Sequence, residues 1–263
     1  MRRHGDQAVS IKDMAQPSGH NSFVRPQPRT VIFVAYPQMG LLDLTGAQTV
    51  FWAATRSLNQ LELPGYVLHT AGLDGGSIRT GEGLVVQTRR LDEFANELID
   101  TLIVPGSPHI RQAMVANASL VDWLRVASTT ARRTTSVCSG AFFLARAGLL
   151  DGLRVATHWM MADMFERLFP QVELDREAIF VQQESLWTAA GVSAGIDLAL
   201  ALVEADNGRE VAMQVARHLV VYYRRPDNQE QWGPLLDSQN STDAYGTGCE
   251  QPPDDAQEHA HQI

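Results

Sequence analysis

Residues 134–147 read TTSVCSGAFFLARA, and this stretch decides the fold. Its first four residues are typical of a short buried strand, and the pattern from Ala141 onward predicts a helix. Only Cys138, Ser139 and Gly140 stand between the two. A strand that turns so abruptly into a helix holds its junction side chain on a tight bend, so we expect Cys138 to be presented at the edge of a sheet.

Segments of strand and helix character alternate on both sides of this stretch. Predicted strands lie at Val31–Tyr36, Tyr66–Thr70, Thr101–Val104, 178–182 and 185–188, and predicted helices lie at Leu42–Ser57, 119–131, 159–168 and within Ser193–Val221. This alternation predicts βαβ units with right-handed crossovers. The expected fold is therefore α/β, a mostly parallel sheet with helices on both faces.

The two ends of the chain differ in the sign of their charge. The 263 residues have a net charge of −9. Residues 1–29 carry five basic side chains against two acidic ones, whereas residues 233–263 carry six acidic side chains and no Lys or Arg. Both ends are rich in polar residues and lack apolar periodicity. We expect one folded domain over 30–232, between a disordered N-terminal extension and a disordered acidic tail.

The composition excludes several classes of function. Among 21 basic residues the only lysine is Lys12, so the body of the chain lacks both the Gly-Lys pair of a P-loop and a Schiff-base lysine. Two cysteines, Cys138 and Cys249, are too few for a thiolate metal cage, and no metal or cofactor is expected. The acidic net charge argues against nucleic acid as a partner. With no signal peptide and no apolar run of membrane-spanning length, we expect a cytoplasmic protein without membrane contact.

In a parallel sheet, ligands bind beyond the C-terminal ends of the strands, which draws attention to Cys138. The N-terminus of the following helix is expected to lower the pKa of its thiol, and the free N–H groups there can stabilise a developing negative charge. The small residues Ser139 and Gly140 leave room for the bend and for a substrate. We therefore favour a reactive thiol over a cysteine that only packs as a small hydrophobic side chain.

Other candidate residues follow the other predicted strands. Asp43 can either act as an acid/base beside the thiol or only favour the dipole of its helix, and the sequence leaves both open. Gly106 and Ser107 are expected to supply a second source of backbone N–H groups facing the nucleophile. His109 lies in the same loop, close to the expected site. His158 is a candidate general base, although a packed structural histidine is the more common role.

A rival nucleophile is Ser193, because GVSAG at 191–195 fits the G-x-S-x-G pattern of hydrolases. A hydrolase of that type needs further strands after the serine, followed by an acid and a histidine. Only His218 follows before the tail, and it stands in the middle of a predicted helix. We therefore expect Ser193 to cap the long helix that follows it.

The chain resembles the ThiJ/PfpI family over about residues 30–232, through VIFVAYPQMGLLDLTG at 31–46, DTLIVPGS at 100–107 and TSVCSGAFFLARAGLL at 135–150. The resemblance implies a flavodoxin-like, class I glutamine amidotransferase-like fold and a homodimer. It also implies that Cys138 is the nucleophile and Asp43 its acid/base partner. Ser139 stands where the isonitrile hydratases of the family have threonine, which keeps the hydroxyl.

Two functions are compatible with this resemblance. Isonitrile hydratases add water to an isonitrile and release an N-substituted formamide. The ligand domains of AraC-type, GlxA-like regulators share CSGAF and a closing RRP…Q pattern, and they are followed by a helix-turn-helix module. Here 31 polar residues follow the expected domain, too few for that module. The sequence therefore predicts a cysteine-dependent enzyme acting on a small molecule, with a ligand-sensing domain that lacks the DNA-binding half as the alternative.

Overall fold

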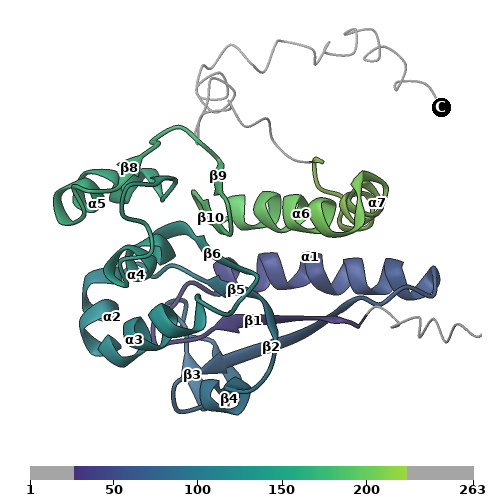
Figure 1. Cartoon of the computed structure of the whole chain (residues 1–263), viewed down its shortest axis with the longest axis horizontal. Helices are drawn as coiled ribbons and strands as arrows, with labels where there is room; N and C mark the ends of the chain where they lie inside the picture. Colours follow the sequence, from purple (N-terminus) through teal and green to yellow (C-terminus); the bar gives the residue numbers. More distant parts are fainter. Residues whose placement is uncertain (1–26, 224–263) are drawn as a thin grey trace, which may run out of the picture.

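The computed structural model describes residues 27–223, which build an eight-stranded sheet of order β3-β4-β2-β1-β5-β6-β10-β9 (Figure 1). The strands are β1 (Arg29–Val34), β2 (Tyr66–Gly72), β3 (Gly76–Arg79), β4 (Val85–Arg90), β5 (Ile99–Val104), β6 (Arg133–Val137), β9 (Phe180–Gln183) and β10 (Leu186–Ala189). All neighbours pair in parallel except β3 with β4 and β9 with β10. Two short strands, β7 (Arg154–Val155) and β8 (Glu173–Leu174), form a separate ladder.

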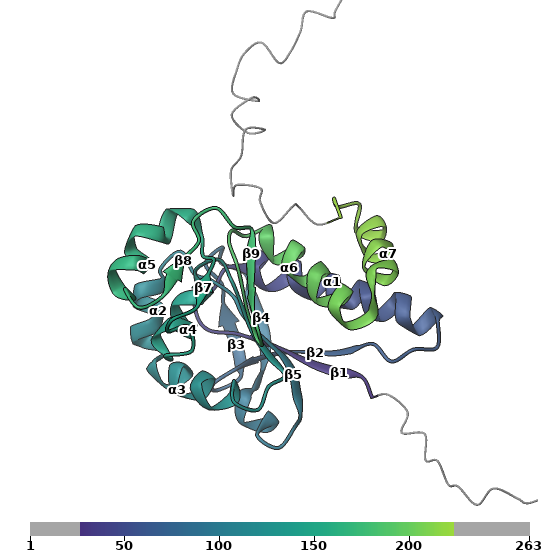
Figure 2. The same cartoon turned by 45° about the horizontal axis from the view of Figure 1, so that its top comes forward.

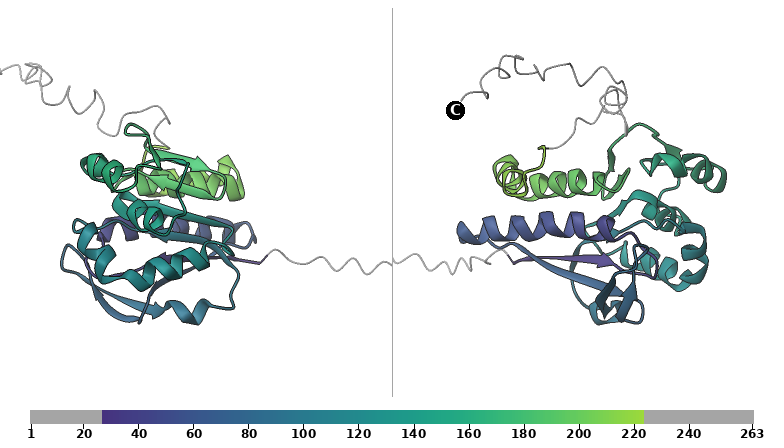
Figure 3. Two further views of the ribbon diagram at one scale, coloured as in Figure 1. Left: turned by 60° about the vertical axis from the view of Figure 1, so that its left-hand side comes forward. Right: turned by 180° about the vertical axis from the view of Figure 1, so that it is seen from behind.

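Helices cover both faces of this sheet. They are α1 (Leu41–Gln60), α2 (Ile110–Ala116), α3 (Ala118–Ala127), α4 (Ala141–Arg146), α5 (Ala162–Leu168), α6 (Ala194–Asn207) and α7 (Arg209–Leu219), with 3₁₀ turns η2 (Leu91–Phe94), η3 (Cys138–Gly140) and η4 (Trp159–Met161). Helices α1, α6 and α7 pack together on one face, and α2 to α5 lie on the other (Figure 2). Figure 3 shows α6 running beside α1. No helix within 27–223 is long and apolar enough to cross a membrane.

The sequences of the central strands match their position in the fold, because both faces of these strands are buried. The side chains of Val31–Val34 in β1 and Leu102–Val104 in β5 are 0% exposed. Strand β6 reads RTTSV and is also buried throughout. Three of its polar side chains, those of Arg133, Thr134 and Thr135, make hydrogen bonds; the Thr135 hydroxyl, for example, donates to the Leu102 carbonyl at 3.0 Å. Burial on both faces is typical of a parallel sheet between two helical layers.

The order of the parallel strands determines where a ligand can bind. Counted along the chain, the five central parallel strands have the flavodoxin-like order 2-1-3-4-5. The order reverses between β1 and β5, and the loops that leave these two strands diverge to opposite faces. This confirms the predicted α/β fold with helices on both faces. It also places the segments after β1, β5 and β6 side by side at one edge of the sheet.

The structure differs from the predicted elements at the margins. The sequence pattern does not predict the β3–β4 hairpin, because the side chains of this hairpin are mostly exposed and mixed in polarity. It also misses β7 and β8, which are two residues long, and α2, which has seven. The domain begins before residue 30, since Arg29 opens β1 and its guanidinium bonds to Asn207 and to the carbonyl of Asp206. Residues 1–26 and 233–263 of the predicted disordered ends, and residues 224–232 of the predicted domain, lie outside the described residues.

An ionic network ties α6 to the N-terminal ends of the strands. The carboxylate of Asp206 is only 1% exposed. It accepts hydrogen bonds from Arg133 at 2.5 and 3.1 Å, from Arg132 at 2.7 Å and from the Tyr66 hydroxyl at 2.9 Å. Arg133 is itself 3% exposed, so its charge has little access to water. A buried guanidinium needs a counter-charge, and Asp206 supplies it at the edge opposite to Cys138.

We expect Asp206→Ala to lower the free energy of unfolding by about 3–5 kcal/mol, because it leaves the buried Arg133 without its main partner. The matched control is Asp122→Ala, which breaks an exposed pair with Arg125 and should change stability by less than about 1 kcal/mol. Urea unfolding followed by circular dichroism measures both. Equal effects of the two variants would contradict the structural role given to Asp206.

Candidate active site

Cys138 occupies a strained bend between β6 and α4. Its φ is +58°, a left-handed conformation that a residue with a Cβ rarely adopts. The bend is possible because residue 140 is glycine: a Cβ there would lie 2.1 Å from the Val104 carbonyl oxygen. Backbone strain of this kind persists only where the surroundings fix it, and it is frequent at active sites. The predicted tight bend at Cys138 is therefore present.

Two neighbouring segments hold the bend in place. The Thr157 hydroxyl donates to the Cys138 carbonyl at 2.9 Å. The Ser139 hydroxyl donates to the Ser107 carbonyl at 2.9 Å and accepts from the Ser107 N–H at 2.9 Å. Ser139 is fully buried, so this pair of bonds joins the segment after β6 rigidly to the segment after β5. The Ser139 side chain therefore acts on the site by fixing its backbone.

Asp43 in the first turn of α1 lies beside the thiol. Its side chain is buried, and its Oδ2 accepts the Gly106 N–H at 2.9 Å. Its other oxygen, Oδ1, has no hydrogen-bond partner among residues 27–223. Gly106 makes this approach possible, because a Cβ there would lie 2.9 Å from Asp43 Oδ2 and 2.6 Å from the Ser139 nitrogen. Asp43 thus lies both in the first turn of a helix and beside Cys138, a position compatible with either of the two roles that the sequence left open.

Burial determines how the two groups titrate. It raises the pKa of Asp43 from 3.8 to about 6, against the lowering effect of the hydrogen bonds from the Gly106 N–H and the Cys138 thiol. Burial, followed by the nearby charge of Asp43, also raises the pKa of Cys138. The expected lowering of the Cys138 pKa by the helix N-terminus is therefore wrong, since desolvation and a neighbouring carboxylate outweigh it. At neutral pH the site holds a protonated thiol beside a carboxylate.

A pocket of about 390 Å³ opens onto the thiol and this carboxylate. Its described lining residues are Gly40, Asp43, Glu82, Ser107, Pro108, Cys138, Ser139, His158, Met160, Met161 and Val192. A volume of this size is suited to a small molecule. Glu82 in the β3–β4 loop was not among the predicted site residues. Only a glutamate between two glycines marks it in the sequence, and its position depends on how the hairpin packs.

The structure reassigns Gly106, Ser107 and His109. The N–H groups of Gly106 and Ser107 are already bonded to Asp43 and Ser139, so they position the site and do not form a free oxyanion hole. This corrects the expectation that they face the nucleophile as donors. His109 is exposed at the N-cap of α2 and is not among the lining residues, although its N–H bonds to Ser107 Oγ at 3.1 Å.

His158 belongs to the pocket wall. Its Nδ1 accepts the Met160 N–H at 3.2 Å, so the ring hydrogen of the neutral form is on Nε2. Burial lowers the pKa of His158, which keeps the ring uncharged at neutral pH. With Nδ1 already bonded, the ring offers the pocket a hydrogen-bond donor, and the general-base role considered for it has less support.

Ser193 occupies the predicted N-cap position of α6 between β10 and that helix, and it does not line the pocket. Its side chain makes no capping bond to the backbone of α6, which lies wholly within the described residues, so that detail of the prediction is wrong. The position of Ser193 agrees with the preference for Cys138 as the nucleophile.

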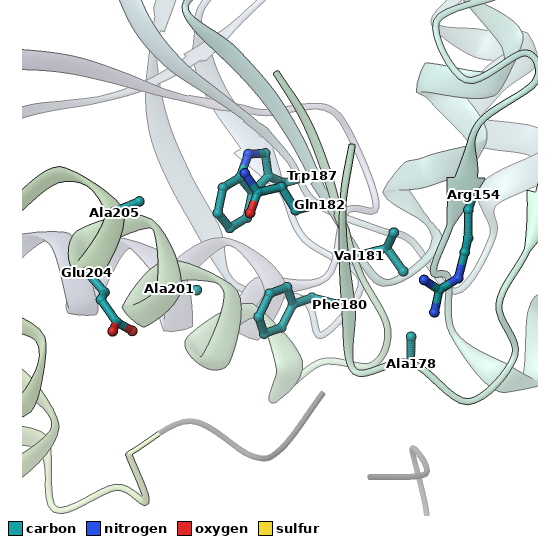
Figure 4. Close-up of a pocket in the computed structure, with 9 residues that line it drawn as sticks. All are labelled: Arg154, Ala178, Phe180, Val181, Gln182, Trp187, Ala201, Glu204 and Ala205. Atoms are coloured by element: carbon teal, nitrogen blue, oxygen red, sulfur yellow. The ribbon is translucent and has the colours of Figure 1, made fainter. Parts of the chain in front are cut away.

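A second hollow, of about 430 Å³, lies between β9, β10 and α6 (Figure 4). Phe180 and Trp187 stack there with ring centroids 6.3 Å apart, and Arg154 and Glu204 stand at its opposite ends. None of its described lining residues is a Cys, Ser or His, so it offers no nucleophile. Residues 27–223 also contain no group of three or more His, Cys, Asp or Glu side chains placed to hold a metal ion.

The raised pKa of Asp43 predicts how the free energy of unfolding depends on pH. The folded protein binds this proton more tightly than the unfolded chain, so stability falls as pH rises from about 4 to about 6. Asp43→Asn removes this loss and should raise the free energy of unfolding at pH 7.5 by about 1–3 kcal/mol, with little gain at pH 4. Urea unfolding at both pH values measures it. A gain that is the same at both would contradict the burial effect, and exposed Asp122→Asn is the control.

Comparisons with known proteins agree with this geometry. The family model of the DJ-1/PfpI family matches residues 29–205. Isonitrile hydratase of Pseudomonas putida is 32% identical over 187 residues, which cover 71% of this chain and 76% of that protein. The HTH-type transcriptional regulator GbdR of Pseudomonas aeruginosa is 28% identical over 208 residues, 79% of this chain. The chain spans only 55% of the length of that regulator.

A solved structure supports the fold. The crystal structure of a ThiJ/PfpI family protein from Pseudomonas syringae superposes with a TM-score of 0.65 at 24% identity, covering 82% of this chain and 86% of that one. At this identity the likeness concerns the fold alone. Together with the family match, the strained cysteine after β6 and the sheet order lead to one conclusion: the chain belongs to the DJ-1/PfpI family.

Proposed function

We propose that this protein adds water to an isonitrile and releases an N-substituted formamide, with Cys138 as the nucleophile. The observation that carries the proposal is the Cys138 thiol at a strained bend, next to a buried Asp43 carboxyl with one unpartnered oxygen. An unpartnered buried carboxylate oxygen is costly unless a ligand or a proton uses it. The similarity to isonitrile hydratase gives further support. The partner under this proposal is a small molecule.

In the first step the Cys138 sulfur adds to the terminal carbon of the isonitrile. The thiol proton passes to Asp43, whose raised pKa of about 6 lets it release the proton again near neutral pH. That proton then moves to the same carbon, which has now formed one bond to sulfur and one to hydrogen. The product is a thioimidate, R–N=CH–S–Cys138. Covalent capture divides one difficult hydration into two easier additions. His158, a neutral N–H donor in the wall, is suited to bond the substrate nitrogen.

In the second step water attacks the thioimidate carbon. Asp43 accepts a proton from the water and delivers it to the nitrogen, giving R–NH–CH(OH)–S–Cys138 and returning Asp43 to its carboxylate form. Collapse of this intermediate breaks the C–S bond, forms the C=O bond and returns a proton to sulfur. The products are the formamide R–NH–CHO and the free thiol. The overall reaction consumes one water and needs no oxidant, reductant or cofactor.

The alternative is a ligand-sensing domain without turnover. The observation in its favour is the match to GbdR, which covers more of this chain than the match to isonitrile hydratase does. Such a domain would hold its ligand in the same pocket. The two functions differ in one measurable respect, because only the enzyme releases product in amounts that exceed the amount of protein.

We expect purified protein to convert a simple alkyl isonitrile to its formamide with multiple turnovers, as measured by NMR or chromatography. Cys138→Ala should lower kcat/KM by at least about 10³-fold, because it removes the nucleophile. Cys249→Ser is the matched control for general thiol effects and should retain activity. A Cys138→Ala variant with full activity would exclude the mechanism, and a wild-type protein that binds the isonitrile but releases no formamide would favour the sensor.

The pH profile tests Asp43. Because the carboxylate must accept the thiol proton, kcat/KM should fall about tenfold per pH unit below about pH 6. Asp43→Asn should be much less active and should lose this inflection. A wild-type profile that stays flat from pH 7 down to pH 5 would show that Asp43 does not act as the base.

A further inference from the structure

Glu82 stands at the mouth of the pocket in a loop whose position is fixed. The N–H groups of Gln38 and Gly81 donate to the carbonyls of Arg79 and Met39, each at 2.9 Å. These bonds attach the β3–β4 loop to the segment that follows β1. Both oxygens of the Glu82 carboxylate in turn accept the Leu41 N–H, at 3.0 and 2.9 Å. The carboxylate is therefore held at the N-terminus of α1, two residues before Asp43.

The charges around the thiol are of one sign. Glu82 and Asp43 are the acidic lining residues, and Glu82 is close enough to raise the pKa of Asp43. None of the described lining residues is Lys or Arg, and His158 is uncharged at neutral pH. The Asp43 Oδ1 is buried without a partner within 27–223. Glu82 also keeps acceptor capacity, since one N–H does not occupy the lone pairs of two oxygens.

The rest of the described wall is mostly apolar. Pro108, Met160, Met161 and Val192 complete it, and two of these are methionines, whose flexible side chains adapt to the shape of a ligand. An apolar wall with two carboxylates and no cation among the described lining residues offers an anion no counter-charge. A neutral group meets an apolar surface, and a cationic group meets Glu82 at the mouth.

We propose that Glu82 determines specificity: it excludes anionic substrates from Cys138 and admits small molecules whose substituent is neutral and apolar or carries a cationic group. For the reaction proposed above, on which this step rests, the substrate class is then alkyl isonitriles and aminoalkyl isonitriles, and isonitriles that bear a carboxylate are rejected. The experiment measures how the charge of a reagent affects its access to Cys138, independently of isonitrile turnover.

The first arm uses three methanethiosulfonate reagents of similar size, with a 2-aminoethyl, a 2-hydroxyethyl or a 2-sulfonatoethyl group. Their rates of modifying Cys138 are measured by mass spectrometry at one pH in a Cys249→Ser background, and each is divided by its rate with 2-mercaptoethanol. We expect the anionic reagent to be slower than the neutral one by about tenfold or more, and the cationic reagent to be the fastest.

Glu82→Gln should narrow the anion-to-neutral ratio by about fivefold or more, and Glu82→Lys should reverse the order of anion and cation. The matched control is Glu62→Gln, an exposed change just beyond the other end of α1, about 30 Å away along a 20-residue helix. It should leave the ratio unchanged. Equal normalised rates for the three reagents would overturn the inference. So would an anion-to-neutral rate ratio that is the same in the wild type and in the Glu82 variants, or a Cys138 that none of the reagents modifies.

The second arm compares kcat/KM for an alkyl isonitrile and for isocyanoacetate. Charge selection together with turnover of only the neutral substrate supports both proposals. Charge selection without turnover of any isonitrile contradicts the proposed reaction and leaves the role of Glu82 supported. Equal turnover of isocyanoacetate and the alkyl isonitrile contradicts the role of Glu82 and leaves the reaction supported.

Discussion

The left-handed backbone at Cys138 is the constraint on which the site depends. Strand β6 would otherwise continue past its end, and φ of +58° turns the chain into α4 while the side chain remains over the pocket. Such a conformation is unfavourable by about 1–3 kcal/mol and has to be imposed by its surroundings. Here the bonds from Thr157 and Ser139 and the contact of Gly140 with the Val104 carbonyl impose it. The rigid sheet thereby fixes the position of one sulfur atom.

The chemistry of that sulfur depends on burial more than on the helix N-terminus. Desolvation raises the pKa of both Asp43 and Cys138, which favours a protonated thiol beside a carboxylate over a preformed thiolate. In the proposed mechanism such a pair holds the proton that is added together with the sulfur. Burial of the Asp43 carboxylate lowers the stability of the folded protein at neutral pH, and the proposed mechanism uses this same buried group to move a proton.

The sequence predicts the fold and the tight bend at Cys138, because their signals are local. Apolar runs mark β1 and β5, and the abrupt change from strand to helix at Cys138 indicates the sheet edge and makes this residue the candidate nucleophile. The sequence cannot predict where backbone N–H groups point. Gly106 and Ser107 are therefore expected to donate to a substrate, although their N–H groups already donate to Asp43 and Ser139. The sequence also cannot predict that Glu82 lines the pocket, because this glutamate lies in a turn and reaches the pocket only through the packing of an exposed hairpin.

In the proposed mechanism Cys138 forms a covalent bond to the isonitrile carbon with assistance from Asp43. Intact-protein and peptide mass spectrometry after rapid acid quenching of a reaction with an alkyl isonitrile detects this bond. We expect the protein to become heavier by the whole mass of the isonitrile, with the adduct mapped to Cys138 and absent from Cys138→Ala. Formamide formation with no adduct on Cys138 at any quench time, or an adduct that persists in Cys138→Ala, would contradict this mechanism.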